Sequence, residues 1–205
     1  LRSRLFEVGY GSKFNADTVR ESSNFALKVE ANFIDLSEIK TEIFYRSTGR
    51  NTRITRGSLL APYVDMPKGV GGYIEFTGPR KPKYIYSLRF ERGKGSEHSP
   101  GISWKNSSRA FIKFMPRDNL SFNMSYNHAE EKNWLNWLDD NLLATYKRKQ
   151  RTSVFELEWF KDNKHELRIK AQLVAFTGRD PIPYLGDKKG KLIQTDIPLS
   201  PITIS

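Results

Sequence analysis

The sequence predicts an all-β protein, an antiparallel up-and-down meander of the type that forms transmembrane β-barrels. Three observations predict this fold class. Apolar and polar residues alternate with a period of two along most of the chain, and short turns alternate with long polar connections. A low mean hydropathy of −0.61 is combined with an aromatic content of 13%. Disordered chains share the low hydropathy but are poor in aromatic residues, so we expect an ordered chain without an ordinary apolar core.

The alternating segments are the expected strands. Apolar residues occupy the odd positions from Phe25 to Phe33, while Lys28, Glu30 and Asn32 lie between them. The same pattern recurs in segments 39–46, 84–91, 109–114, 119–127 and 165–173. Successive side chains of a strand point to opposite faces of a sheet, so each segment has one apolar and one polar face. Strands of roughly 9–11 residues with this alternation are typical of transmembrane β-barrels.

The connections between these strands alternate in length. Short turns are expected at 34–37, 77–83, 115–118 and 161–164. Long polar loops are expected at 11–22, 47–69, 93–102, 127–141 and from 177 onward. Tight turns at one end of a sheet and long loops at the other describe a meander of antiparallel hairpins, as in outer-membrane barrels.

Segment 142–160 has two interpretations. One long strand keeps the rhythm of short and long connections unbroken, and the change of parity near Thr152–Val154 then indicates a β-bulge. The alternative is a separate turn at Lys147–Thr152.

In the barrel interpretation, the apolar faces contact lipid and the charged faces line a wet lumen. The charges predicted to face the lumen are Glu156, Glu158, Arg168 and Lys170. Aromatic residues close to the short turns are predicted to form a belt at one lipid–water interface. These residues are Phe33, Phe76, Tyr84, Phe114, Phe122 and Trp159.

A soluble antiparallel sheet with one solvated face would show the same alternation. In this second interpretation the net charge of +11 suits a basic face that binds an anionic ligand. The rhythm of the connections and the low hydropathy favour the barrel. The basic residues are spread over turns and single strand positions, so we predict solvated surfaces and no nucleic-acid partner.

Closure of the barrel limits what this chain can be. About nine strands are expected, whereas a bacterial single-chain barrel has an even number, and an unpaired strand edge cannot lie in hydrocarbon. Residues 1–205 are therefore predicted to be a single β-barrel domain truncated at both ends, an incomplete barrel. Outer-membrane lipid is its predicted partner.

Residues for chemistry are few. The three histidines lie on different expected elements without paired spacing, so we predict no catalytic residues, no metal site and no cofactor. Trp134 and Trp137 lie in the expected loop 127–141 and are candidates for ligand contact, because an exposed indole can stack on a sugar face. The alternative is that they anchor the loop to the barrel rim or to the lipid interface.

Several stretches resemble a known family. They are FIKFMPRDNLSFNMSYNHAEE (111–131), NWLNWLDDNLLATYKRKQRTSVFELEWF (133–160), HELRIKAQLVAF (165–176) and RGSLLAP (56–62). Together they resemble the C-terminal domain of unknown function of bacterial carbohydrate-binding family 9 domain-containing proteins. Gly57-Ser58 stands where that family usually has Gly-Gly.

The resemblance implies a non-enzymatic outer-membrane β-barrel behind an N-terminal sugar-binding-type β-sandwich. It also implies a location in the bacterial outer membrane and a part in carbohydrate or polymer binding or uptake. It supplies no catalytic residues.

Overall fold

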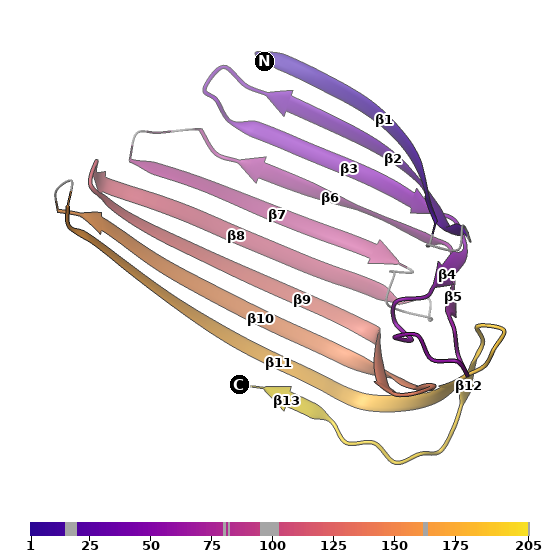
Figure 1. The fold of residues 1–205 in the computed structure, drawn as a ribbon. Coiled ribbons are helices and arrows are strands. Elements are labelled where there is room, and N and C mark those ends of the chain that lie inside the picture. The colour runs from indigo at the N-terminus through magenta and orange to yellow at the C-terminus, as the bar shows by residue number, and fades with distance from the viewer. Residues whose placement is uncertain (15–19, 80, 82, 95–102, 162–163, 205) are drawn as a thin grey trace.

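Nine long antiparallel strands form one curved sheet in the computed structural model, which describes residues 1–14, 20–79, 81, 83–94, 103–161 and 164–204 (Figure 1). The strands are β1 (Ser3–Phe14), β2 (Arg20–Asn32), β3 (Glu38–Arg46), β6 (Gly69–Thr77), β7 (Tyr84–Lys94), β8 (Trp104–Arg117), β9 (Leu120–Asp139), β10 (Leu142–Phe160) and β11 (Glu166–Gly186). The short strands β12 (Leu192–Gln194) and β13 (Ile202–Ile204) pair with β11. The prediction of an all-β antiparallel meander is confirmed.

The sheet is open. Its order is β1-β2-β3-β6-β7-β8-β9-β10-β11-β12, so each long strand pairs with the next long strand along the chain. Among the described residues, β1 has no partner on its outer edge, and β11 has only the two short strands on its own. The long strands thus form a wall with two separated edges.

The four short turns lie at one end of this wall, as the alternation of connections predicts. In the turn between β2 and β3, the amide of Ser37 donates to Asp35 Oδ1 at 3.1 Å and its hydroxyl donates at 2.7 Å. Both bonds hold the pKa of the Asp35 carboxyl below its ordinary value, because they favour the ionised form. Leu36 takes a positive φ of 66° to close the turn.

Two of the predicted long loops are wrong. Strand β9 continues to Asp139 and β10 begins at Leu142, so a tight turn at Asp140–Asn141 replaces the loop 127–141. Strand β11 likewise continues to Gly186, beyond the loop expected from residue 177. The physical reason is a pair of register shifts, of β10 against β9 at Tyr146/Arg148 and of β10 against β11 at Thr145/Lys147, which interrupt the period of two in otherwise regular strands. The expected loops at 11–22 and 93–102 fall partly outside the described residues.

Strand β10 is one continuous strand, so the alternative turn at Lys147–Thr152 is wrong. The β-bulge expected at Thr152–Val154 is also wrong, because pairing with β9 and β11 is unbroken there. Val154 is instead an apolar residue on the same side as Glu156. A short turn at Asp118–Asn119 also replaces the one expected at 115–118.

A buried cluster holds segment 47–68 against the far end of the sheet. This segment contains the hairpin of β4 (Gly49–Asn51) and β5 (Val64–Met66). Val64 and Met66 pack with Leu135 and Leu143, of which Val64 and Leu143 are fully buried. Polar contacts add to the packing: the Ser58 hydroxyl donates to Asp140 Oδ1 at 2.9 Å, and the Asp65 amide donates to the carbonyl of Gly190 at 2.8 Å.

Leu143→Ala is expected to loosen this segment, because it leaves a cavity in the cluster and costs about 2–5 kcal/mol. The measurement is limited proteolysis of the full chain, with cleavage expected to become faster within residues 47–68. Leu59→Ala is the matched control, since Leu59 is 88% exposed in the same segment. Equal cleavage rates in the two variants would contradict the described packing.

Candidate functional site: an apolar face and a polar face

The register places most of the large exposed apolar side chains of the long strands on one side of the sheet, while Leu5, Phe160 and Val174 lie on the other. Starting from Val8, the pairs Val8–Leu27, Leu27–Ile43 and Ile43–Gly72 assign each strand's apolar positions to the same side. We call this side the apolar face. Its larger members are Phe6, Val8, Tyr10, Phe25, Leu27, Val29, Ile43, Tyr45, Val70, Ile74, Phe76, Tyr86, Leu88, Phe90, Ile112, Phe114, Phe122, Met124, Tyr126, Phe155, Leu157, Trp159, Leu167, Ile169 and Leu173. Leu173 is 74% exposed and Phe6 is 67% exposed.

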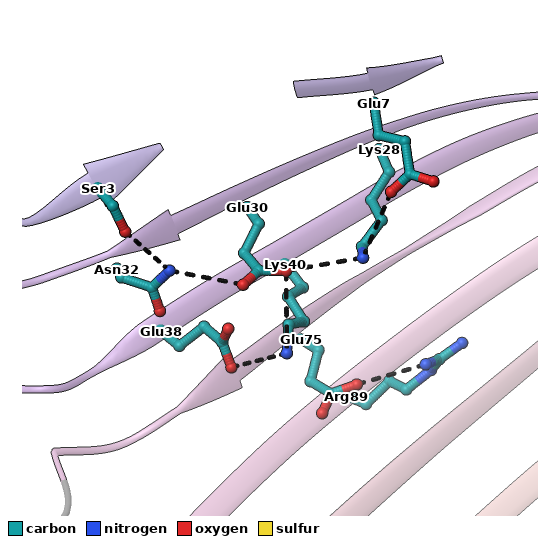
Figure 2. A network of polar contacts seen from close by, with 9 residues as sticks. All are labelled: Ser3, Glu7, Lys28, Glu30, Asn32, Glu38, Lys40, Glu75 and Arg89. Atoms are coloured by element: carbon teal, nitrogen blue, oxygen red, sulfur yellow. Dashed lines mark hydrogen bonds and ion pairs between the residues drawn. The ribbon is translucent and has the colours of Figure 1, made fainter. Parts of the chain in front are cut away.

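The opposite side, the polar face, carries charges that alternate in sign across its inner strands. One row of register partners runs Glu30, Lys40, Glu75 and Arg89 across β2, β3, β6 and β7, and its next member on β8, Arg109, has the same sign as Arg89. Figure 2 shows the contacts: Lys40 Nζ lies 2.8 Å from Glu38 Oε2, and Arg89 Nη1 lies 3.3 Å from Glu75 Oε2. Opposite charges in directly facing positions stabilise a sheet, each pair by about 0.2–1 kcal/mol.

On the inner strands β2, β3, β6 and β7, the charged side chains of the polar face are better covered than the apolar side chains of the other face. The side chains of Glu30 and Glu38 are 18% and 20% exposed, and that of Arg89 is 34% exposed. On the edge strands β1 and β11, Glu7, Arg168 and Lys170 are 60%, 64% and 63% exposed. Side chains crowd together on the concave side of a curved sheet and spread apart on its convex side. The exposures therefore indicate that the polar face is concave and the apolar face convex.

The four charges predicted to share one face all lie on the polar face of β10 and β11. Glu156 pairs with Lys170 across the strands, and their side chains meet at 2.7 Å. Glu158 pairs with Arg168 in the backbone register and accepts a hydrogen bond of 3.2 Å from the Ser121 hydroxyl, while Arg168 forms an ion pair with Glu166.

Five of the six predicted belt aromatics lie on the apolar face, near the short turns. Tyr84, Phe114 and Phe122 are register partners, and the rings of Phe114 and Phe122 stack with centroids 6.4 Å apart. Phe76 and Trp159 lie on the same face. The sixth, Phe33, lies in the turn between β2 and β3.

Sequence reasoning missed aromatic residues that extend this group. Tyr86 lies 6.1 Å from the ring of Phe76, and Phe155 lies 6.5 Å from that of Phe122. A second row, Tyr10, Phe25 and Tyr45, crosses β1, β2 and β3 close to the long connections. The period of two could have revealed this row, because these residues are in phase with the other apolar positions of their strands.

The apolar segments form a band that crosses the strands obliquely. Val8 lies at the centre of the apolar segment of β1. Its row of register partners begins with apolar residues on β1, β2 and β3 and consists of polar residues from β7 onward. The row continues through Leu27, Ile43, Gly72, Arg92, Asn106, Glu130 and Lys149 to Thr177. On β11 the apolar segment instead runs from Leu167 to Leu173. The centre of this segment lies about seven residues from Thr177, or about 23 Å along the strand.

This displacement shows that the band is inclined to the rows of register partners. The displacement along the strands accumulates from β1 to β11, which are about 38 Å apart across the sheet at the usual interstrand spacing. The band is therefore inclined by about 30° to the hydrogen-bonded rows, close to the strand tilt of about 35–45° found in barrels.

Trp134 and Trp137 lie on β9, not in a loop. The Trp134 ring packs edge-on against Phe176 with centroids 5.4 Å apart, and also contacts Tyr146. The Trp137 indole donates to the carbonyl of Asp140 at 2.9 Å, and the Arg56 guanidinium lies 4.6 Å from its ring centroid. In these positions Trp134 packs the end of the sheet, and Trp137 joins the β9–β10 turn to segment 47–68.

Phe44 covers two glycines on the polar face. A Cβ at Gly71 would lie 2.6 Å from Phe44 Cζ and 2.9 Å from the Cα of Gly93. Both distances are too short for real atoms, so the aromatic ring and the neighbouring strand approach each other only because residue 71 has no side chain.

Other kinds of site find little support in the described parts of the chain. No three side chains among the described His, Asp and Glu residues are grouped as metal ligands. No described helix is long and apolar enough to span a membrane. Comparison with protein-family models, with curated proteins and with solved structures finds no match. The family resemblance seen in the sequence therefore stays a prediction.

Gly71→Ala is expected to destabilise the sheet by about 1–3 kcal/mol, because the backbone of Gly93 cannot give way as a flexible side chain can. Chemical denaturation of the full chain measures the difference. Gly9→Ala is the matched control, since a Cβ at this strand position meets nothing within 4 Å. A second variant, Gly71→Ala with Phe44→Leu, should recover only part of the loss, because the contact with Gly93 remains.

Proposed function

We propose that this chain forms part of a transmembrane β-barrel in a bacterial outer membrane, with its apolar face against lipid and its polar face towards a water-filled interior. The observation that carries the proposal is the inverted distribution of side chains. On the inner strands, Ile43 and Ile74 are 57% and 52% exposed, whereas the side chains of Glu30 and Glu38 are 18% and 20% exposed. A soluble protein buries the first kind of residue and exposes the second.

The size of the apolar face supports lipid as its cover. Soluble monomers rarely expose a contiguous apolar patch larger than a few hundred Å², and this one extends over nine strands. A bilayer covers such a face without any specific partner, since apolar side chains on the outside of a barrel contact acyl chains.

The oblique band supports a planar cover. A bilayer has constant thickness, so the lipid-facing apolar residues of a barrel form a band of constant height. Because the strands are tilted, such a band crosses their rows of register partners obliquely. The band from Val8 on β1 to Ile169 on β11 has this form. A second protein sheet packed on the same face would not require the inclination of a barrel wall.

The two open edges set a condition on the proposal. Unpaired backbone groups in hydrocarbon cost several kcal/mol each, so β1 and the membrane-level part of β11 need partners. Nine long strands do not make the even number of a bacterial barrel. The complete barrel therefore includes at least one strand beyond these nine.

The proposed role of the barrel is non-enzymatic, in the binding or uptake of a carbohydrate or a related polymer. The family resemblance suggests this class of solute. The polar face is compatible with it, because Ser121, Asn123, Ser125 and Asn127 place neutral hydrogen-bonding groups along β9 on that side. Hydroxyl-rich solutes are bound by groups of this kind.

The decisive experiment is fractionation of the cell envelope, followed by electrophoresis of the extracted full chain with and without boiling. Recovery in the outer membrane with heat-modifiable migration is expected, since a closed barrel resists detergent until it is heated. Recovery in the soluble fraction without detergent would overturn the proposal. It would favour the soluble alternative, a sheet that binds an anionic ligand through a basic face.

Val29→Arg is expected to impair membrane insertion, because a cation facing the middle of the lipid costs about 2–4 kcal/mol. Val29 lies on the apolar face of β2 and is 38% exposed. The same change at Val154, on the polar face of β10 between Ser125 and Gln172, is the control and should be tolerated. The measurement is the heat-modifiable fraction after folding into liposomes. Equal losses for both variants would contradict the assignment of the faces.

A further inference from the structure

The apolar face becomes basic on β7–β11, beyond the apolar band on the side of the long connections. Beyond the band, towards the long connections, three of these strands carry cationic side chains on this face. They are Arg92 and Lys94 on β7, Lys147, Lys149 and Arg151 on β10, and Arg179 on β11. We call these six residues the basic girdle. On the same stretch of these strands, the described carboxylates facing this way are Glu130 and Asp180.

The two carboxylates engage only part of this charge. Lys149 Nζ lies 3.0 Å from Glu130 Oε1, and Lys147 Nζ lies 2.7 Å from Asp180 Oδ2. Both lysine side chains remain 63% exposed. Within the described chain, Arg92, Lys94, Arg151 and Arg179 have no ion pair with a carboxylate, so the girdle keeps a net positive charge.

An aromatic ring stands among these cations. Trp104 of β8 pairs with Lys94 and is 40% exposed. The Arg92 guanidinium lies 4.4 Å from its ring centroid, and Lys94 Nζ lies 5.8 Å from it. Tryptophan is enriched at the level of lipid head groups, and long basic side chains reach from there towards water.

The distance from the band suits the head-group level. On β10 the last apolar residue of the band is Phe155, and Arg151 lies four positions further, about 13 Å along the strand. On β7, Arg92 follows Phe90 after one intervening residue. Because the strands are inclined, Arg92 and Arg151 lie at roughly the depth where phosphate groups begin, and Lys147, Lys149 and Arg179 lie further from the band.

The girdle covers one arc of the wall only. On β1–β3 the corresponding positions beyond Tyr10, Phe25 and Tyr45 are serines. The hydroxyls of Ser12 and Ser23 hydrogen-bond to each other at 2.8 Å, and the Ser47 hydroxyl accepts from the Ser23 amide at 3.0 Å. A general need for solubility at the rim would not separate cations and serines in this way.

We propose that the basic girdle binds the phosphate groups of anionic lipids in the membrane leaflet on the side of the long connections. The inference rests on the proposed function, because it requires the apolar face to lie in a bilayer. The girdle then offers what an anionic head group needs. Its guanidinium groups have no carboxylate partner among the described residues and can make bidentate phosphate contacts, and Arg92 lies at the head-group depth next to the indole of Trp104.

The test uses the full chain folded into liposomes, with tryptophan fluorescence quenched by brominated lipids. The brominated lipid is either anionic phosphatidylglycerol or zwitterionic phosphatidylcholine. The difference in quenching between the two gives the binding constant of the anionic lipid relative to that of the zwitterionic lipid. The expected result is a preference for the anionic lipid, weakened by salt. R92Q/R151Q/R179Q should reduce this preference by about fivefold for each cation that contributes. W104F should remove most of the selective quenching, because Trp104 stands among the cations.

The matched control removes three cations at the other end of the strands. K83Q/R117Q/K161Q changes the same net charge near the short turns and should leave the preference intact. No anionic preference in the unaltered chain, equal effects of the two triple variants, or complete displacement by inorganic phosphate would each overturn the inference. Heat-modifiable migration of the same samples keeps the proposed barrel under separate test, since a barrel that folds normally without lipid preference contradicts the girdle alone.

Discussion

The continuous register of the nine long strands is the constraint on which the rest of the structure depends. A strand has a side-chain period of two, so a slip of one residue would move every apolar side chain to the polar face. The pairs Tyr84–Phe114 and Glu156–Lys170 show the consequence, because each unites residues of one kind across two strands. The apolar face, the rows of alternating charge and the oblique band all follow from this ladder.

The ion pairs of the polar face do not account for the stability of the sheet. Partly exposed pairs contribute about 0–1 kcal/mol each, and Lys40 with Glu38 is of this kind. Their alternation in sign across β2, β3, β6 and β7 has another consequence: it lets many charges share a concave surface with little repulsion. Arg89 between Glu75 and Glu91 illustrates this arrangement. In the proposed barrel, a wet interior can therefore be densely charged and still be crossed by neutral polar solutes.

The sequence predicted the elements that depend on local alternation and missed those that depend on distant contacts. Strand β10 was predictable as one piece because a single strand over Leu142–Phe160 keeps the alternation of short and long connections unbroken. The continuation of β9 to Asp139 was not, because the register shift beside Trp134 breaks the period of two. The packing of Val64 on Leu135 joins positions about seventy residues apart, and no periodicity records such a contact. The basic girdle was hidden for the same reason, since Arg92 and Lys149 meet on one surface only through the register.

Strands β9, β10 and β11 change character along their length, and this change explains why they are about twice as long as β3 and β6. Near the short turns, their apolar side chains lie exposed on one face. Beyond the basic girdle, both faces are covered. Residues Leu143 to Tyr146 are all buried, segment 47–68 packs on Leu143, and Trp134 packs on Tyr146 and on Phe176. A strand needs protein cover only where lipid does not provide it, because water would otherwise meet its apolar side chains. In the proposed barrel, the buried cluster marks the level at which the wall leaves the membrane, and the girdle lies at the boundary between lipid cover and protein cover.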